Sequence, residues 1–337
     1  MHVLERTLFR RWPRLAETLP RVDIGVRETP IEAWTHDDVS IAVKRDDLTT
    51  PTLGGNKARA LQLLLAGVAP GDVLLTVGST GSTHALAVAH FGAQLGATTR
   101  VVTWPQEEHD VSRATTERLR ALARVTGAAS PVTAMARATL LRLTSRVRWI
   151  PAGGTSPLGA LGHAAAAIEL GDQIESGEKA FDTLVVPLGT GGTAAGLMVG
   201  LALAGLPTRV VGVRVVPRVV ANRGRVLRLA DRAARLFGRL AGVAPPSIDA
   251  RRFSVDGEHY GGAYARETRD SRELAAFVRG TGGPALDGTY SGKALAGALA
   301  YARRAPAERV LYWLTFDGRW LDARDGARGT ANDGDDG

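Results

Sequence analysis

The sequence of 337 residues contains no cysteine. Disulfide bonds, thiolate metal sites and thiol nucleophiles are therefore excluded together. The seven histidines are dispersed, and His84 and His90 stand six positions apart, a spacing that does not place both on one helix face. We therefore expect no metal site.

Long apolar runs are also missing. No stretch reaches the roughly 18 apolar residues that a membrane span requires. The first twenty residues carry several arginines and no continuous apolar segment, so we expect no secretory signal. These features favour a cytoplasmic protein without a membrane partner.

Aromatic residues make up only 5% of the chain, whereas the formal net charge is +8. Excess positive charge can indicate nucleic-acid binding. Here the arginines are scattered, and no basic stripe carries aromatic residues on which bases could stack. We therefore expect no nucleic-acid partner.

Lysine is scarce as well. Of 42 basic residues only four are lysines: Lys44, Lys57, Lys179 and Lys293. Any chemistry that needs an amine nucleophile has these four candidates. We expect Lys44 to lie on a strand and to pair with a carboxylate of Asp46–Asp47, and Lys179 to be solvated in a polar loop.

Lys57 follows Gly54, Gly55 and Asn56 and begins an apolar helical segment. The dipole at a helix N-terminus opposes a positive charge. This position therefore predicts an amine with a lowered pKa, as a Schiff-base lysine requires. A solvated surface lysine is the alternative, and Lys293 is the competing candidate for the reactive amine.

Short apolar, β-branched segments alternate with longer helix-like segments along the chain. This alternation predicts βαβ units and an α/β fold with doubly wound, mainly parallel sheets. The predicted strands cover residues 40–44, 73–77, 100–104, 147–150, 183–187, 209–216 and 310–315. The predicted helices cover residues 58–66, 84–95, 112–124, 161–170, 194–203, 225–240, 272–279 and 293–303.

Three predicted strands end in glycine-rich turns, which should line one cleft, because ligands bind at the carboxyl ends of parallel strands. The richest of these turns contains Gly189, Thr190, Gly191, Gly192 and Thr193 and leads into a helix. Backbone N–H groups and the helix dipole there can hold a phosphate. A dinucleotide site and a purely structural turn are the alternatives, although the glycine spacing is not G-x-G-x-x-G.

A second turn places four hydroxyl residues within five positions before a predicted helix. They are Ser79, Thr80, Ser82 and Thr83, and His84 follows. One hydroxyl suffices to cap a helix. The others can bind an anion such as a substrate carboxylate, so we place Ser79, Ser82, Thr83 and His84 in a substrate site.

Together these segments resemble the fold-type II pyridoxal-phosphate (PLP) enzymes, and specifically the D-cysteine desulfhydrase and aminocyclopropane-carboxylate deaminase family. The likeness extends from about residue 10 to about residue 318. Besides the segments above, it includes Trp12-Pro-Arg-Leu, Glu28-Thr-Pro-Ile-Glu, Lys44-Arg-Asp-Asp-Leu, Ile150-Pro-Ala-Gly-Gly-Thr-Ser-Pro-Leu-Gly and Leu286-Asp-Gly-Thr-Tyr-Ser-Gly-Lys.

The resemblance implies a two-lobed fold of the tryptophan synthase β type, with PLP bound to Lys57 beside Asn56. It implies that Gly189–Thr193 binds the phosphate and that Ser82 is the substrate-side serine. The implied roles of the remaining site residues are active-site tyrosines at Tyr264 and Tyr290, a contact of Thr83 to the cofactor's ring oxygen, and a threonine facing the pyridine nitrogen at Thr315.

We expect residues 1–58 and 158–325 to form a large lobe, residues 59–157 a small inserted lobe, and residues 326–337 a disordered acidic tail. We also expect a homodimer that acts on a small amino acid.

The chain departs from the family pattern at several positions around the cofactor. Thr83 stands in place of an asparagine, Ala60 in place of a basic residue, and the residues after Thr315 are Phe-Asp-Gly in place of Gly-Gly. Ser291 stands in place of the glutamate that follows the tyrosine in the deaminase.

With Ser291 and Thr315 both neutral, the cofactor should be a weaker electron sink, which suits elimination of a good leaving group. We therefore expect α,β-elimination from an amino acid such as D-cysteine, with Lys57 moving the Cα proton. The alternatives are aminocyclopropane-carboxylate deamination, a specialised β-replacement reaction, and a catalytically silent ligand-binding relative.

Overall fold

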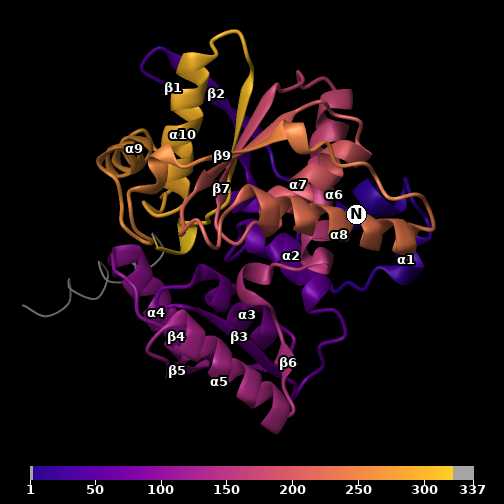
Figure 1. Cartoon of the computed structure of the whole chain (residues 1–337), viewed down its shortest axis with the longest axis vertical. Helices are drawn as coiled ribbons and strands as arrows, with labels where there is room; N and C mark the ends of the chain where they lie inside the picture. Colours follow the sequence, from indigo (N-terminus) through magenta and orange to yellow (C-terminus); the bar gives the residue numbers. More distant parts are fainter. Residues whose placement is uncertain (1–2, 322–337) are drawn as a thin grey trace, which may run out of the picture.

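Two β-sheets organise the chain in the computed structural model, which describes residues 3–321 (Figure 1). The six-stranded sheet has the order β1-β2-β10-β7-β8-β9, in which only the β1–β2 pair is antiparallel. Its strands are β1 Ile31–His36, β2 Val39–Arg45, β10 Val310–Leu314, β7 Thr183–Leu188, β8 Arg209–Arg214 and β9 Phe253–Asp256. The expected α/β class with mainly parallel sheets is confirmed.

The second sheet has four parallel strands in the order β5-β4-β3-β6. They are β5 Arg124–Gly127, β4 Thr98–Trp104, β3 Val73–Ser79 and β6 Arg148–Trp149. All four lie within the segment 59–157 that we expected to form an inserted lobe. The exact lobe boundaries remain a prediction, and the expected tail at 326–337 lies outside the described residues.

Helices cover both faces of each sheet (Figure 1). Alternate residues of β7 point to opposite sides: Leu184 and Val186 pack with α6–α8, whereas Val185 packs with α9 and α10. In the smaller sheet, Leu74 packs with α3, and Leu75 and Val77 pack with α5 on the other face. The main helices are α1 Leu15–Thr18, α2 Asn56–Leu64, α3 Thr83–Gln94, α4 Asp110–Leu122, α5 Pro131–Thr144, α6 Pro157–Glu175, α7 Gly192–Leu203, α8 Arg223–Ala241, α9 Arg269–Gly280 and α10 Ser291–Arg304.

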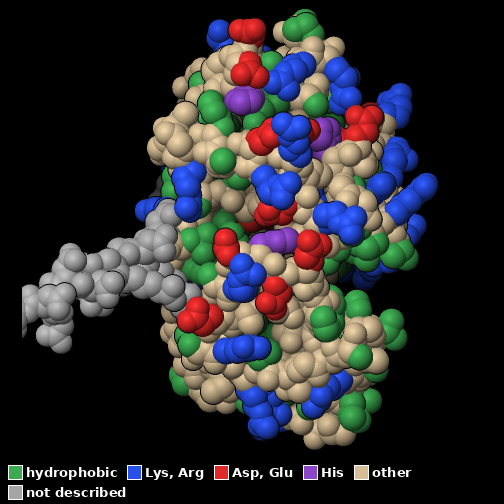
Figure 2. Space-filling view, turned by 90° about the vertical axis from the view of Figure 1, so that its left-hand side faces the viewer, with side chains coloured by type: hydrophobic (Ala, Val, Ile, Leu, Met, Phe, Trp, Pro, Cys, Tyr) green, Lys and Arg blue, Asp and Glu red, His purple; other side chains and the backbone are tan. Residues whose placement is uncertain are grey.

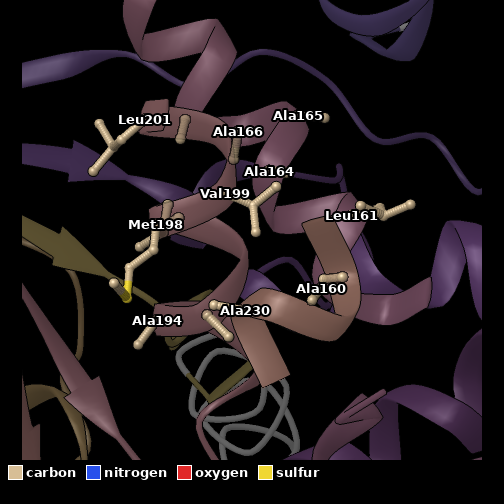
Figure 3. Close-up of a cluster of buried hydrophobic side chains, with 14 of the residues drawn as sticks. Ala160, Leu161, Ala164, Ala165, Ala166, Ala194, Met198, Val199, Leu201 and Ala230 are labelled. Atoms are coloured by element: carbon tan, nitrogen blue, oxygen red, sulfur yellow. The ribbon is translucent and has the colours of Figure 1, made fainter. Parts of the chain in front are cut away.

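Small residues let α6 and α7 approach closely in the core of the large lobe (Figure 3). A Cβ atom added to Gly196 would lie 2.2 Å from the Ala160 carbonyl oxygen, and one added to Gly200 would lie 2.2 Å from that of Ala164. Any larger residue there must push the helices apart, because cores are packed as densely as organic crystals. The close packing fixes the start of α7, where the expected phosphate loop lies.

A buried charge network joins the two halves of the large lobe. Arg59 pairs with Asp46 at 2.7 Å and with Glu169 at 2.9 Å, and Lys44 pairs with Glu169 at 2.6 Å. Our prediction that Lys44 pairs with Asp46 or Asp47 was wrong. The Lys44 side chain points to α6, and Asp47 instead pairs with Arg45 at 2.8 Å.

All seven predicted strands are present, but strands β1, β5 and β9 and helices α1 and α5 were not predicted. Strands β1, β5 and β9 lie at sheet edges, where burial patterns are weak. Helix α5 carries apolar residues on both faces: Ala134 and Ala138 are buried, whereas Val132 and Leu143 are exposed. That distribution hides the 3.6-residue periodicity by which a helix is recognised.

Charged side chains of both signs are interspersed over the face shown in Figure 2. Among the described helices, none combines the length and apolar character that crossing a bilayer would need.

Candidate active site

A cavity of about 680 Å³ lies where the carboxyl ends of strands from both sheets meet. Its lining includes Lys57, the turn after β3, the loop after β7 and the segment 287–290 before α10. The volume falls within the range of roughly 300–1,000 Å³ that is usual for small-molecule sites. The glycine-rich turns that we expected to share one cleft therefore do so.

Lys57 is half-buried at the first turn of α2 and lines this cavity. Burial lowers the pKa of its amine from 10.5 to about 8, although the nearby Asp287 carboxylate opposes the shift. Removal from water disfavours the ammonium form, so a substantial share of the amine is neutral just above pH 7. This is the state that a nucleophilic lysine needs.

The other three lysines do not line the cavity. Lys44 is held by Glu169, as described above. Lys293 is buried, donates to the Tyr260 carbonyl oxygen at 2.7 Å and lies 5.6 Å from the Tyr260 ring centroid. Burial lowers the pKa of Lys293 to about 8 as well, so a lowered pKa alone does not distinguish the two. The position in the structure does distinguish them, because Lys57 lines the cavity and Lys293 does not.

The expected phosphate loop forms the start of α7. Gly191 has φ +92°, a left-handed conformation that favours glycine, and helix α7 begins at Gly192. Among the described residues, no protein acceptor is recorded for the backbone N–H groups of residues 190–194. Thr193 Oγ1 accepts a 2.7 Å hydrogen bond from Asn56 Nδ2, which brings this loop next to the segment that carries Lys57.

The hydroxyl residues at the end of β3 and in the turn after it make different contacts. Ser82 caps α3, since its Oγ accepts from the Ala85 N–H at 3.2 Å. Ser79 Oγ lies 3.1 Å from the Tyr264 hydroxyl, and Thr80 Oγ1 donates to the Trp104 carbonyl oxygen. Ser79, Ser82 and Thr83 line the cavity, whereas Thr80 does not.

His84, the second residue of α3, also lines the cavity. Its Nε2 lies 3.2 Å from Thr76 Oγ1, and its Nδ1 is buried without a hydrogen-bond partner. Burial, and secondarily the Lys57 charge, lowers the pKa of His84 to about 3, so its imidazole is neutral.

Two tyrosines join the small sheet to α10 through a chain of hydroxyls. Tyr264 OH lies 3.1 Å from Ser79 Oγ and 3.0 Å from Tyr290 OH. Burial raises the pKa of Tyr290 well above 10, so this hydroxyl keeps its proton. The chain can pass a proton between neutral hydroxyl groups at the cavity wall.

Sequence reasoning missed Asp287 as a residue of the cavity wall. Its carboxylate accepts from the N–H groups of Tyr290 and Ser291 and from Ser291 Oγ at 2.9 Å. Both oxygens are thereby used at the start of α10. Asp287 stands six residues before the predicted helix 293–303 and four before the observed start of α10, so the usual pattern of a helix start did not single it out.

Ser291, which we expected to stand in the position of the deaminase glutamate, does not line the cavity. It is fully buried, and its hydroxyl donates to Asp287. Thr315 does line the cavity and is 8% exposed. Within the described part of the chain, only its backbone has a recorded hydrogen bond, from the Asn56 N–H at 3.1 Å. Its hydroxyl is therefore available to a ligand.

These groups fit the chemistry of PLP. A buried amine, a row of open N–H groups at a helix start and a buried free hydroxyl match an aldehyde, a phosphate and a ring nitrogen. The positive φ at Gly191 keeps a side chain out of the phosphate loop.

Comparisons with known proteins agree with this geometry. A family model described as pyridoxal-phosphate dependent enzyme matches residues 22–315. The "Putative 1-aminocyclopropane-1-carboxylate deaminase" of Pyrococcus furiosus is 32% identical over 88% of this chain and 92% of its own length. The D-cysteine desulfhydrase of Serratia proteamaculans is 28% identical over 82% of this chain and 87% of its own.

A solved structure of an ACC deaminase homologue superimposes with a TM-score of 0.76 and 29% identity, covering 94% of this chain and 95% of the other. A tomato (Solanum lycopersicum) threonine deaminase, at 18% identity and a TM-score of 0.62, shares the fold. The two-lobed, fold-type II architecture is thereby confirmed, together with the cofactor. This chain belongs to the family of pyridoxal-phosphate-dependent enzymes and is an enzyme of the aminocyclopropane-carboxylate deaminase and D-cysteine desulfhydrase type.

Proposed function

We propose that this enzyme catalyses α,β-elimination from a small amino acid such as D-cysteine and releases a 2-oxo acid, ammonia and sulfide. The observation that carries the proposal is the buried, unoccupied hydroxyl of Thr315 in the cavity wall. Two carboxylates of the lining, Asp287 and Asp317, already have partners: Asp287 accepts from Ser291, and Asp317 accepts from Arg319 and from the Gly54 N–H. A neutral partner suits reactions in which a leaving group takes the negative charge with it.

PLP, when bound, withdraws electrons from the substrate Cα. Lys57 would hold the cofactor through Nζ and then take the Cα proton on the same atom. Its pKa of about 8 suits a group that gives up and accepts a proton near neutral pH. The N–H groups of residues 190–193 and the hydroxyl of Thr193 would hold the phosphate.

The start of α3 would bind the substrate carboxylate. Thr83 and Ser82 lie at its first turn, where the helix dipole favours an anion. Thr83 in addition would contact the cofactor's ring oxygen, and the neutral His84, which lines the same cavity, would complete the substrate site. Tyr290 and Tyr264, whose hydroxyls are 3.0 Å apart, would supply a proton to the departing sulfur.

Two experiments test this proposal. Borohydride reduction of the holoenzyme and peptide mapping should find the pyridoxyl group on Lys57, with Lys179→Ala as a matched control; a label on Lys293 would overturn the assignment. Purified enzyme should release 2-oxo acid and sulfide from D-cysteine. No product from either cysteine enantiomer would contradict elimination.

Aminocyclopropane-carboxylate deamination is the second candidate, favoured by the similarity to the Pyrococcus protein. Opening the ring offers no good leaving group and needs strong electron withdrawal, which a threonine hydroxyl supports poorly. We therefore expect slow or no turnover of this compound. Efficient turnover would make deamination of aminocyclopropane carboxylate the better proposal for the activity, in place of D-cysteine elimination. Product formation with an added thiol would instead indicate β-replacement. A holoenzyme that reacts with no amino acid would indicate a catalytically silent relative.

The remaining site assignments from the sequence stay within this proposal, as do the cytoplasmic location and the homodimer. Light scattering of the purified holoenzyme tests the oligomeric state. A measured mass equal to that of one chain would contradict the dimer.

A further inference from the structure

The loop from β9 to α9 contributes Tyr264 and Glu267 to the cavity lining and contacts residues 59–157 at two points. Tyr264 OH contacts Ser79 Oγ at 3.1 Å, and His109 Nε2 contacts the Ala265 carbonyl oxygen at 2.5 Å. Ala265 is fully buried with φ +63°, a conformation that residues with a Cβ rarely adopt. These contacts define where the next cavity residue of the loop, Glu267, is held.

Glu267 is half-buried, and its carboxylate lies against Gly288 in the cavity wall. A Cβ atom added to Gly288 would lie 2.1 Å from Glu267 Oε1, so the missing side chain at Gly288 leaves room for the carboxylate in its present position. Lys293 is within electrostatic reach, but its ammonium donates to the Tyr260 carbonyl oxygen. Within the described residues, no hydrogen bond or ion pair to the Glu267 carboxylate is recorded.

The other two carboxylates of the described cavity lining already have partners. Asp287 accepts from Ser291, and Asp317 accepts from Arg319 and from the Gly54 N–H. Of the lining cations, Lys57 would hold the cofactor, and Arg225 is exposed. Glu267 is therefore the lining carboxylate of the described residues that has neither a hydrogen bond nor an ion pair.

A partly buried carboxylate without a donor is unfavourable, because it has lost water without gaining a hydrogen bond. Much of the lining is apolar, with Trp104, Val216 and Met135 among its residues. The Oε1 atom of Gln106 in the same lining is also buried without a partner in the described residues, but it is a neutral acceptor, whereas Glu267 offers a carboxylate. A ligand that places a donor there gains a charge-assisted bond, and a site of this kind discriminates strongly against analogues that lack the donor.

We infer that Glu267 selects amino acids whose side chain ends in an ammonium or another strong hydrogen-bond donor, the class of the short diamino acids. The inference rests on the proposed function only in that the ligand is an amino acid bound beside the cofactor. Glu267 is on this view a specificity residue and takes no part in bond breaking.

The test compares how tightly two amino acids of similar size bind to the holoenzyme. Binding is measured through the change that it causes in the cofactor's visible absorption. 2,4-Diaminobutyrate carries a terminal ammonium, and norvaline ends in a methyl group; both enantiomers of each are used. We expect the diamino acid to bind about 10- to 100-fold more tightly, as a charge-assisted hydrogen bond supplies. Glu267→Gln should remove most of this preference.

Glu258→Gln is the matched control, since Glu258 belongs to the same loop, is exposed and pairs with Arg304. It removes the same charge outside the cavity and should keep the preference. Equal binding of the two ligands by the unmodified enzyme, or an unchanged preference in Glu267→Gln, would overturn the inference. No absorption change with either ligand would overturn it too. Sulfide release from cysteine is scored separately, so failure of the proposed elimination is told apart from failure of this inference.

Discussion

The side chain of Asn56 donates a 2.7 Å hydrogen bond to Thr193 Oγ1, across 137 positions of sequence. Asn56 precedes Lys57, the Schiff-base lysine of our proposal, and Thr193 lies in the first turn of α7, after the proposed phosphate loop. If the proposal is correct, this bond sets the spacing between the lysine and the phosphate ends of the cofactor site.

We expect Thr193→Val to weaken PLP binding about 5- to 10-fold, because it removes one hydrogen bond of roughly 1 kcal/mol together with a hydroxyl near the phosphate. Titration of apoenzyme with PLP measures this. Thr144→Val serves as control, since Thr144 Oγ1 donates to the Leu140 carbonyl oxygen within α5 and Thr144 does not line the cavity. Equal losses in the two variants would show that the Asn56 bond has no special role.

The rate at which apoenzyme captures PLP should follow the titration of Lys57. With a pKa of about 8, the neutral amine rises about tenfold between pH 7 and pH 9 and then changes little. An ordinary lysine would continue to gain neutral amine to about pH 11. Stopped-flow absorbance across this range separates the two, and a rate still climbing steeply above pH 9 would contradict the lowered pKa.

Glu169→Gln should destabilise the protein by about 3–5 kcal/mol, because it leaves Lys44 and Arg59 buried with insufficient negative charge. The Arg59 and Lys44 charges lower the pKa of Glu169 from 4.5 to about 2 despite its burial. Its contribution to stability is therefore complete above pH 4.5 and is lost as the pH falls toward 2. Chemical denaturation at pH 7 and pH 4 measures both effects. The exposed ion pair Arg235–Asp231 provides the control. Asp231→Asn should change the free energy of unfolding by less than ~1 kcal/mol.

Ala265→Gly should be neutral or stabilising, by up to about 1 kcal/mol, since glycine relieves the left-handed strain at φ +63° but loses more entropy on folding. Ala265→Val should destabilise instead. Thermal unfolding of both variants checks this order, and a clear loss of stability in the glycine variant would show that the Ala265 methyl group matters more than its backbone.

Ser291→Ala should lower stability by about 1 kcal/mol without changing the absorption of the bound cofactor, because its hydroxyl caps α10 through Asp287. Thr315→Val should change that absorption, since the only free hydroxyl placed for the ring nitrogen in our proposal is lost. A spectral change in the serine variant and none in the threonine variant would reverse these two roles.

The parallel sheets and the shared cleft could be predicted because strand, glycine turn and helix follow one another in the sequence at residues 73–94 and 183–203. Lys57 could be singled out because lysine is so scarce. The partner of Lys44 could not be predicted, because Glu169 is 125 positions away and nothing local favours it over Asp46. The role of Ser291 was misjudged because its neighbour in sequence, Tyr290, faces the cavity, whereas one residue further the helix turns the side chain inward.

Strand β10 lies between β2 and β7, with Leu311 opposite Ala42 on one side and Leu184 on the other. The centre of the large sheet therefore cannot close during synthesis until residues 310–314 have left the ribosome. The four-stranded sheet, drawn from residues 73–149 alone, needs no later segment to pair its strands. Because domains tend to fold as units and N-terminal parts first, the turn after β3, proposed to bind substrate, should be ordered before the loop after β7, proposed to bind phosphate.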